Sequence, residues 1–253
     1  MNIANRRYLQ KLIKEEVQRM IREAEDDAPA PNPQIEAELE KALEDAGKSF
    51  ASEMNKIAKD TETKLKDEDE VQQVIDDNPE LEKLAKESVS IKNRLKDGKI
   101  SLQEREKLNE EIFSILGITS ILMALPAVVT LIGKLVSVIE RKLGGKKEMG
   151  EKIQHFGHEM HEMVLKLIQK GMMLIPGFKK MPSDKQKKIV HLVHIVIVLM
   201  LAIQSGGVAI GEIKAGLEAA NVGLASFEGV LTAVKSGEVL AFLREAVMDI
   251  LEA

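Results

Sequence analysis

The sequence predicts an all-α chain, an elongated multi-helix protein with a long apolar helical hairpin and several amphipathic helices. Two apolar runs of about 22 residues, 112–133 and 189–210, carry this prediction. As a helix, each run would span about 33 Å, close to the thickness of a bilayer's hydrocarbon core. Neither run shows a polar stripe at the 3.6-residue period, so each belongs either in lipid or at the centre of a helical bundle.

The composition limits the chemistry that the chain performs. Its 253 residues include no cysteine, which excludes disulfides and thiolate metal sites. The formal net charge of -5 gives no reason to expect nucleic acid as a partner. The chain has one tyrosine, six phenylalanines and no tryptophan. Membrane proteins usually carry aromatic belts at both interfaces, so this composition speaks against lipid-embedded helices.

The N-terminus predicts a tag on a tether. Residues 4–23 place their apolar side chains on one face of a helix, and most of their cations lie off that face. There is no apolar signal-peptide core in this segment. Residues 24–34 hold three prolines and three acids, a composition typical of an extended, solvated linker. We therefore expect residues 1–23 to form an amphipathic tag and residues 24–34 to form its linker.

The tag also resembles a known kind of leader. Its Leu-x-x-Leu-Ile-x-Glu-Glu pattern, residues 9–16, is similar to the N-terminal segments of internal virion proteins in T-even-like marine tailed phages. The resemblance implies targeting into the prohead, with phage capsid or scaffold proteins as partners. It further implies cleavage after an Ile/Leu-x-Glu site that precedes a small residue. Ile21, Glu23 and Ala24 fit that site, and Ile13-Lys14-Glu15 is a fainter match because Glu16 follows it.

Residues 35–100 predict a charged helical region. Asn-Pro pairs at 32–33 and 78–79 are typical of helix starts, which gives helices over 33–66 and 79–96 with a short helix or turn over 69–77. The sparse apolar residues of the first helix lie three, four or seven apart. This spacing favours a narrow seam over a globular core. Such a seam serves either a homo-oligomer or a solvated helical hairpin.

The segment around Gly98 admits two interpretations. An EF-hand alignment on Gly98 would put Leu95 where calcium needs an oxygen ligand. A helix–turn–helix corner needs only that Gly98 ends one helix while Ser101 and Glu104 form a capping box for the next. We expect the corner.

Residues 101–253 are predicted to form the apolar hairpin domain with its C-terminal helices. The first long helix should run to about Leu143 with a kink at Pro126. An amphipathic helix over about 147–175 follows, and Ser183 is expected to cap the second apolar helix. Small residues recur every seven positions from Ala202 to Gly223, and a final helix covers 238–251.

The five histidines are the candidate metal ligands. His158 with His161, and His191 with His194, are neighbours on a helix face. If the two helices are antiparallel, the pairs would surround a metal only if they lay at the same level. Each pair lies near the start of its helix, so we expect them at opposite ends. No catalytic triad, P-loop or dinucleotide motif is present. We therefore predict no enzyme activity, catalytic residue, cofactor or metal.

The segment between the apolar runs is rich in lysine. If the runs cross a membrane, the positive-inside rule would hold this connection on the cytoplasmic side; otherwise its cations would bind anionic headgroups. An ordinary solvated hairpin is the remaining interpretation. The candidate membrane-surface contacts are Lys142, Lys146, Lys147, Lys179, Lys180, Lys187 and Lys188.

These features together predict a non-enzymatic, membrane-interacting, virion-associated protein of a tailed bacteriophage. Its mechanism would be insertion of the apolar helices as a hairpin into a lipid bilayer, and its location the virion, the host cell membrane, or both. Two alternatives remain: a pore-forming or holin-like membrane protein, and a soluble helical bundle that binds other proteins. The soluble bundle accounts for the missing aromatic belts.

Overall fold

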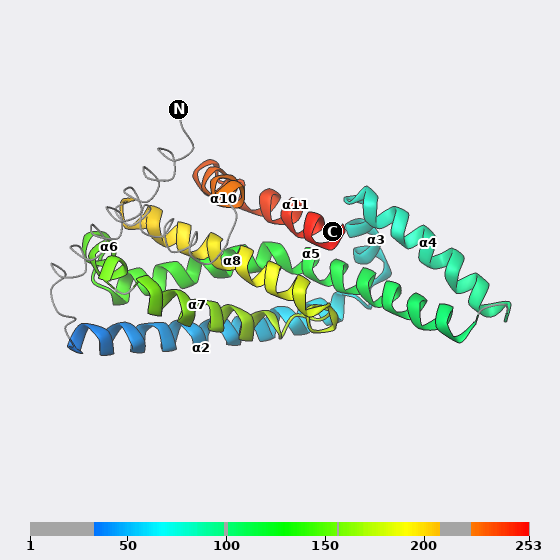
Figure 1. Cartoon of the computed structure of the whole chain (residues 1–253), viewed down its shortest axis with the longest axis horizontal. Helices are drawn as coiled ribbons and strands as arrows, with labels where there is room; N and C mark the ends of the chain where they lie inside the picture. Colours follow the sequence, from blue (N-terminus) through cyan, green and yellow to red (C-terminus); the bar gives the residue numbers. More distant parts are fainter. Residues whose placement is uncertain (1–32, 99–100, 156, 208–223, 253) are drawn as a thin grey trace, which may run out of the picture. The chain divides into compact units, whose positions relative to one another are not determined.

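A computed structural model describes residues 33–98, 101–155, 157–207 and 224–252. It confirms the all-α class, since each regular element in these ranges is a helix. The chain divides into two compact units, 1–37 and 38–253, and of the first only residues 33–37, the start of α2, are described. The apolar region and the charged region from residue 38 onward belong to the second unit. Figure 1 colours the chain by residue number. The elements are α2 (Pro33–Lys64), α3 (Glu68–Asp76), α4 (Pro79–Lys96), α5 (Leu102–Lys142), α6 (Lys146–His155), α7 (Gly157–Met172), η1 (Phe178–Lys180), α8 (Ser183–Gln204), α10 (Leu224–Ser236) and α11 (Val239–Glu252).

Local signals fix most helix ends. The Ser101 hydroxyl accepts a hydrogen bond from the backbone N–H of Glu104, whose carboxylate accepts from the Ser101 N–H, so the predicted capping box forms. α4 begins at Pro79 as the Asn-Pro pair predicts. The expectation for Ser183 is wrong. Ser183 is the first residue of α8, and the preceding residue, Pro182, has no side chain that can cap.

α8 is the central helix of the bundle. It contacts α5, α7, α10 and α11. From Ile189 to Ser205 no residue is exposed. A helix enclosed on all sides must be apolar on all sides, because a polar face there would be buried without water. Its position therefore accounts for the second apolar run without lipid.

α5 differs from the sequence expectation, because the structure reveals a solvent face on its second half. The exposed residues recur every three or four positions, the period of one helix face. Those of the face are Ala127, Thr130, Lys134, Ser137 and Arg141, and the exposed Pro126 and Lys142 flank it. Small and weakly polar side chains hide this face in the sequence, where only Lys134 and Arg141 are charged. The first apolar run is consequently one-sided over this part of the helix.

The two apolar helices run in the same direction. α7 and α5 are antiparallel, because Val164 lies beside Ile139 in one cavity lining while Gly177, just after α7, lies against Gly117. α8 then reverses direction again after a short connection (Figure 1). In the chain, α7 lies between the two apolar helices and runs in the opposite direction to both. The two apolar helices therefore do not form a direct antiparallel hairpin.

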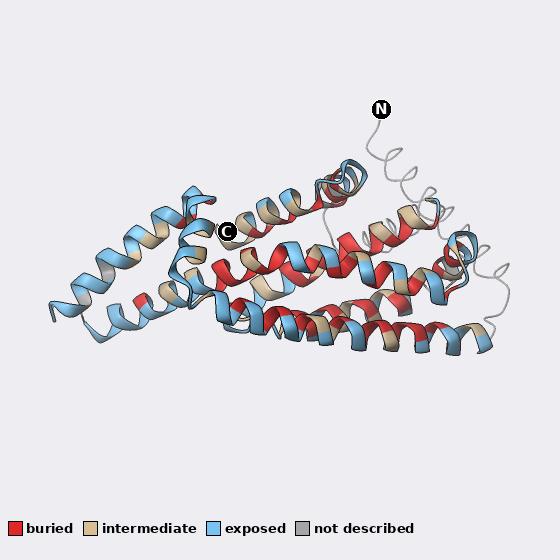
Figure 2. Cartoon of the chain, turned by 180° about the vertical axis from the view of Figure 1, so that it is seen from behind, coloured by how far each residue is buried: buried red, intermediate tan, exposed pale blue. Residues whose placement is uncertain are grey.

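α2 contributes its apolar face to this core, against the expectation of a separate seam. Figure 2 shows one side of α2 buried and the other exposed. Gly47 packs against Leu167 of α7, and Gly171 of α7 packs against Phe50, so closely that a Cβ on either glycine would overlap its neighbour. The buried face of α2 includes small residues as well as large apolar ones, among them Ala42, Ala46 and Gly47. The spacing of large side chains alone missed this, because small residues allow the close approach.

The connection between α7 and α8 is held against α5 by two glycines. A Cβ on Gly177 would overlap the backbone of Gly117, and Gly177 itself has φ +85°. Gln186 ties the same connection: its side-chain amide donates to the carbonyls of Phe178 and Met181, both at 2.9 Å. These contacts place the start of α8 beside the start of the apolar part of α5.

This close approach predicts a difference between two glycines that share a backbone conformation. Gly177 and Gly206 both have φ +85°, but nothing lies within 4 Å of a Cβ on Gly206. Both alanine variants incur the left-handed conformational cost. Gly177→Ala should lose about 1–3 kcal/mol more stability, because it also forces α5 and the connection apart. Urea denaturation of both variants measures this; equal losses would contradict the steric role of the contact.

Candidate functional site

Two histidines meet between α7 and α8. The rings of His161 and His194 lie 4.2 Å apart between centroids, at an interplanar angle of 89°. His161 lies eleven residues before the end of α7 at Met172, and His194 eleven residues after the start of α8 at Ser183. In an antiparallel pair these positions are level. The expectation that the histidine pairs lie at opposite ends is therefore wrong for His161 and His194, because α8 begins earlier than its apolar run.

His194 is enclosed in an apolar setting. It is 0% exposed, and in the described part of the chain neither ring nitrogen has a hydrogen-bond partner. Burial, together with a smaller effect of the nearby His161 and His191, lowers the pKa of His194 to about 3. Burial also lowers the pKa of His191, which lies one turn away at the edge of the bundle. The buried imidazole is therefore neutral at physiological pH.

Acid should destabilise the bundle through His194. When unfolded, this histidine binds a proton below about pH 6.5, but the folded protein protonates it only near pH 3. Its contribution is complete above pH 6.5 and declines as pH falls, by about 2 kcal/mol at pH 5. Thermal unfolding from pH 7.5 to pH 5 should show this loss, and His194→Leu should reduce it. An unchanged pH dependence in His194→Leu would contradict the assignment, with His191→Leu as a control that changes less.

The histidines do not assemble a metal centre in the described ranges. No group of three or more His, Asp or Glu side chains there is placed to hold a metal ion. The side chains of His155 and His158 lie outside the described ones. The absence of a metal and of enzyme activity stays a prediction.

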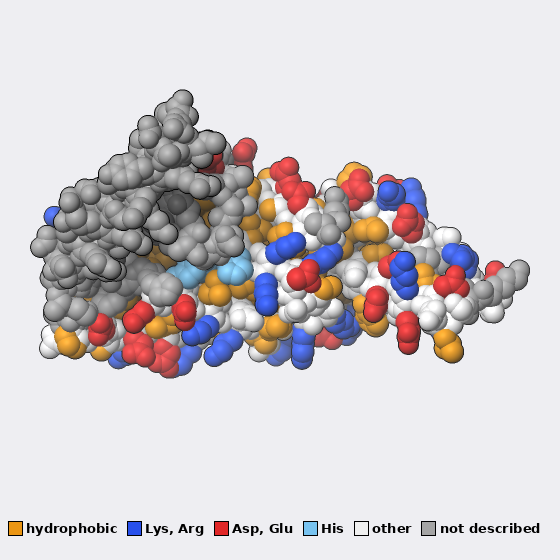
Figure 3. Space-filling view, viewed as in Figure 1, with side chains coloured by type: hydrophobic (Ala, Val, Ile, Leu, Met, Phe, Trp, Pro, Cys, Tyr) orange, Lys and Arg blue, Asp and Glu red, His pale blue; other side chains and the backbone are white. Residues whose placement is uncertain are grey.

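The candidate membrane-surface lysines fall into two sets at opposite ends of the bundle. Lys142, Lys146 and Lys147 lie at the end of α5 and the start of α6, where Lys142 pairs with Asp45 of α2 at 3.3 Å. Lys179, Lys180, Lys187 and Lys188 lie on η1 and the first turns of α8, where cationic side chains gather in Figure 3. The two sets are separated by the α5 segment from Gly117 to Lys142, about 38 Å of helix. They do not share one surface.

The second lysine set has apolar neighbours that the sequence did not single out. Phe113 and Leu116 of α5 are 47% and 44% exposed, and Leu174 after α7 is 39% exposed. The Lys180 ammonium lies 4.6 Å from the centre of the Phe113 ring. The i, i+3 spacing of Phe113 and Leu116 was visible in the sequence, but their exposure depends on which side of α5 the other helices cover.

Two hollows flank the same connection. A groove of about 260 Å³ lies between α4, α5, the start of α8 and Leu251, with Glu111 and Lys185 in its wall. Lys185 donates to the Leu251 carbonyl at 2.7 Å. A groove of about 250 Å³ on the α7 side is lined by Gln169, Lys187 and His191 among apolar residues.

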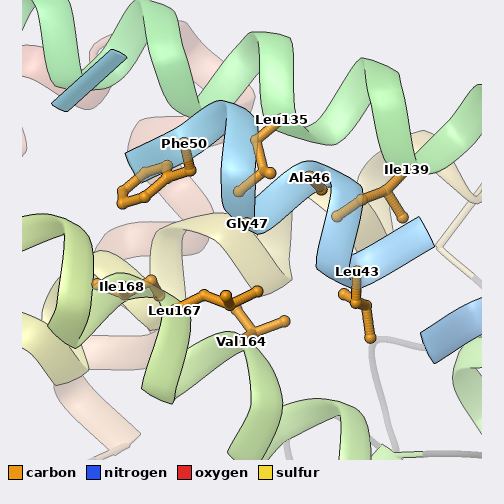
Figure 4. A pocket seen from close by; sticks show the side chains of 9 residues that line it. All are labelled: Leu43, Ala46, Gly47, Phe50, Leu135, Ile139, Val164, Leu167 and Ile168. Carbon is orange, nitrogen blue, oxygen red and sulfur yellow. The ribbon is translucent and has the colours of Figure 1, made fainter. Parts of the chain in front are cut away.

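A third hollow is a gap in the core. Side chains of α2, α5 and α7 turn toward one another around it (Figure 4). Its volume is about 10 Å³, near the minimum for one water molecule. Apolar residues line it: Leu43, Ala46, Gly47, Phe50, Leu135, Ile139, Val164, Leu167 and Ile168. It is too small for a substrate.

The candidate processing residues Ile21, Glu23 and Ala24 lie outside the described residues, as do the expected tag and most of its linker. Comparison with protein-family models, with curated proteins and with solved structures found no match to this chain.

Proposed function

We propose that the chain is a non-enzymatic, virion-associated protein of a tailed bacteriophage that engages a lipid bilayer. One observation carries the membrane part: exposed Phe113 and Leu116 adjoin lysines at the α7–α8 connection. The phage part is supported only by the leader-like sequence and the Ile21-Arg22-Glu23 site.

Engagement occurs through the surface of the folded bundle. α5 and α8 are long and apolar enough to cross a membrane. In the most apolar 18-residue segment of each helix, however, 61% (α5) and 67% (α8) of the segment is buried inside the fold. α7 lies between them in the chain, and its Glu159, Glu162, Lys166 and Lys170 are exposed. Each charge at the bilayer centre costs about 2.5–3.5 kcal/mol. The bundle therefore cannot enter lipid intact, and the folded state binds peripherally.

The pore-forming alternative requires α7 to leave the bundle, and this requirement separates it from surface binding. The chain lacks cysteine, so an engineered pair forms a single defined disulfide. A Cβ on Gly47 would lie 3.2 Å from Leu167 Cγ, so Gly47→Cys with Leu167→Cys brings two thiols within bonding reach. Oxidation should lock α7 onto α2.

The locked protein should still bind vesicles if our proposal is right. In flotation with vesicles that contain phosphatidylserine, oxidised and reduced forms of this double variant should bind equally and release no entrapped dye. Dye release by the reduced form alone would favour the pore-forming alternative. Absence of flotation by the unmodified chain would refute membrane engagement.

A soluble helical-bundle interaction protein is the second candidate function. It is favoured by the burial of α8, where no residue from Ile189 to Ser205 is exposed, which explains that part of the apolar run as core. This candidate predicts a chain that remains in solution with every vesicle composition.

The phage assignment is tested at single residues. A T-even-like prohead protease should cut between Glu23 and Ala24, because prolines at 29, 31 and 33 prevent a helix from propagating across the site and favour an extended strand that a protease can bind. Glu23→Ala should block the cut, while Glu25→Ala, the matched control, should leave it intact. Mass spectrometry should find Ala24 as the N-terminus in mature particles. An intact Met1 terminus throughout, or no association with particles, would remove this assignment.

A further inference from the structure

The end of the bundle at the α7–α8 connection presents apolar side chains to solvent. Phe113 and Leu116 are 47% and 44% exposed and are neighbours at i, i+3 on α5. Farther along α5 the solvent face consists instead of residues such as Thr130, Lys134 and Ser137. Large apolar side chains of α5 are therefore exposed at the end near the α7–α8 connection. Toward the other end, its exposed face is made of small, polar and charged residues.

The same end is rich in cations on flexible stems. Lys179 and Lys180 are exposed, and Lys185, Lys187 and Lys188 follow within the next two turns. Asp184 lies among these lysines in the chain, and Glu87 and Glu111 line the groove that contains Lys185, so the five lysines outnumber these three acids. Lys180 lies over the Phe113 ring at 4.6 Å, so cation and apolar side chain form one surface.

We propose that this connection surface, made of Phe113, Leu116, Lys179 and Lys180, is where the protein docks on an anionic lipid bilayer. The inference rests on the proposed function and names its site and lipid class. Phe113 and Leu116 enter the headgroup boundary, and the lysines contact anionic headgroups. Lysine ammoniums are point charges without the fixed fork of arginine. They suit the shifting charges of a fluid surface better than one fixed carboxylate on a protein.

The opposite end of the bundle supplies the matched control. Lys146 and Lys147 are also exposed. In that set Lys142 pairs with Asp45, and the large exposed apolar side chains of α5 are Leu102, Phe113 and Leu116, toward its other end. A site defined by charge alone would use both ends, whereas the connection surface uses one.

Tryptophan reporters test which end meets the lipid, because the natural chain has none. Phe113→Trp should shift its emission to the blue with phosphatidylcholine vesicles that contain phosphatidylserine, and not with phosphatidylcholine alone. Ser137→Trp, about 36 Å farther along the same helix, should not shift. Thermal unfolding of each variant checks that the bundle is retained.

Charge-neutralising variants measure how much the lysines contribute to vesicle binding. Lys179→Gln with Lys180→Gln should weaken partition into anionic vesicles about thirtyfold, from about 1 kcal/mol for each lysine near the surface. Arginine at both positions should restore binding. Lys146→Gln with Lys147→Gln should change partition less than twofold. Added salt should weaken binding of the unmodified chain.

The possible outcomes separate the inference from the function on which it rests. If the unmodified chain floats with vesicles but the Lys146 and Lys147 variant loses as much binding as the Lys179 and Lys180 variant, the docking site is wrong and membrane engagement stands. A shift of Ser137→Trp equal to that of Phe113→Trp also overturns the site. If the chain binds polyglutamate and no vesicle, the surface recognises acidic protein, and both the inference and the proposed function fail.

Discussion

The rest of the structure depends on the enclosure of α8. A helix that is apolar on every face leaves no side on which water is acceptable, so neighbouring helices must cover it completely. Each large aliphatic side chain contributes about 1.5–3 kcal/mol when removed from water, and the buried residues from Ile189 to Ala202 form a nearly continuous series of them. α5, α7, α10 and α11 each give one apolar face to this task. Their other faces remain free to be charged, which explains how a chain with two bilayer-length apolar runs has 30% charged residues.

The same enclosure bears on whether α5 and α8 can insert into a bilayer. Length and apolarity are shared by spanning helices and by central core helices, so the two runs alone do not choose between them. The charges on α7 and the parallel direction of α5 and α8 are features of this fold that bear on the choice. Both oppose insertion of the intact bundle, because α7 would have to cross the hydrocarbon with its acids and lysines. Any contact of the intact fold with a bilayer must therefore begin at its surface.

Features set by neighbouring residues were predictable from the sequence. The capping box of Ser101 and Glu104, the start of α4 at Pro79 and the end of α5 near Leu143 each depend on a few adjacent side chains. Features set by tertiary packing were not predictable. The level contact of His161 with His194, the core role of α2 and the exposure of Phe113 depend on where distant helices lie. The weakly polar face of α5 was missed because Ala127, Thr130 and Ser137 resemble an apolar run in composition.

The contact of Gly117 with Gly177 links the core to the surface. It lets the α7–α8 connection lie directly on the backbone of α5. A Cβ on Gly177 would overlap that backbone, and a Cβ on Gly117 would lie only 3.2 Å from the Gly177 carbonyl oxygen. The connection then places Lys180 over Phe113. A cation above the ring is attracted by its quadrupole, so an aromatic side chain that must remain in water gains a polar partner there. A close approach of two glycines, which serves packing in the core, thereby also sets cation and apolar side chain together at the exposed end of the bundle.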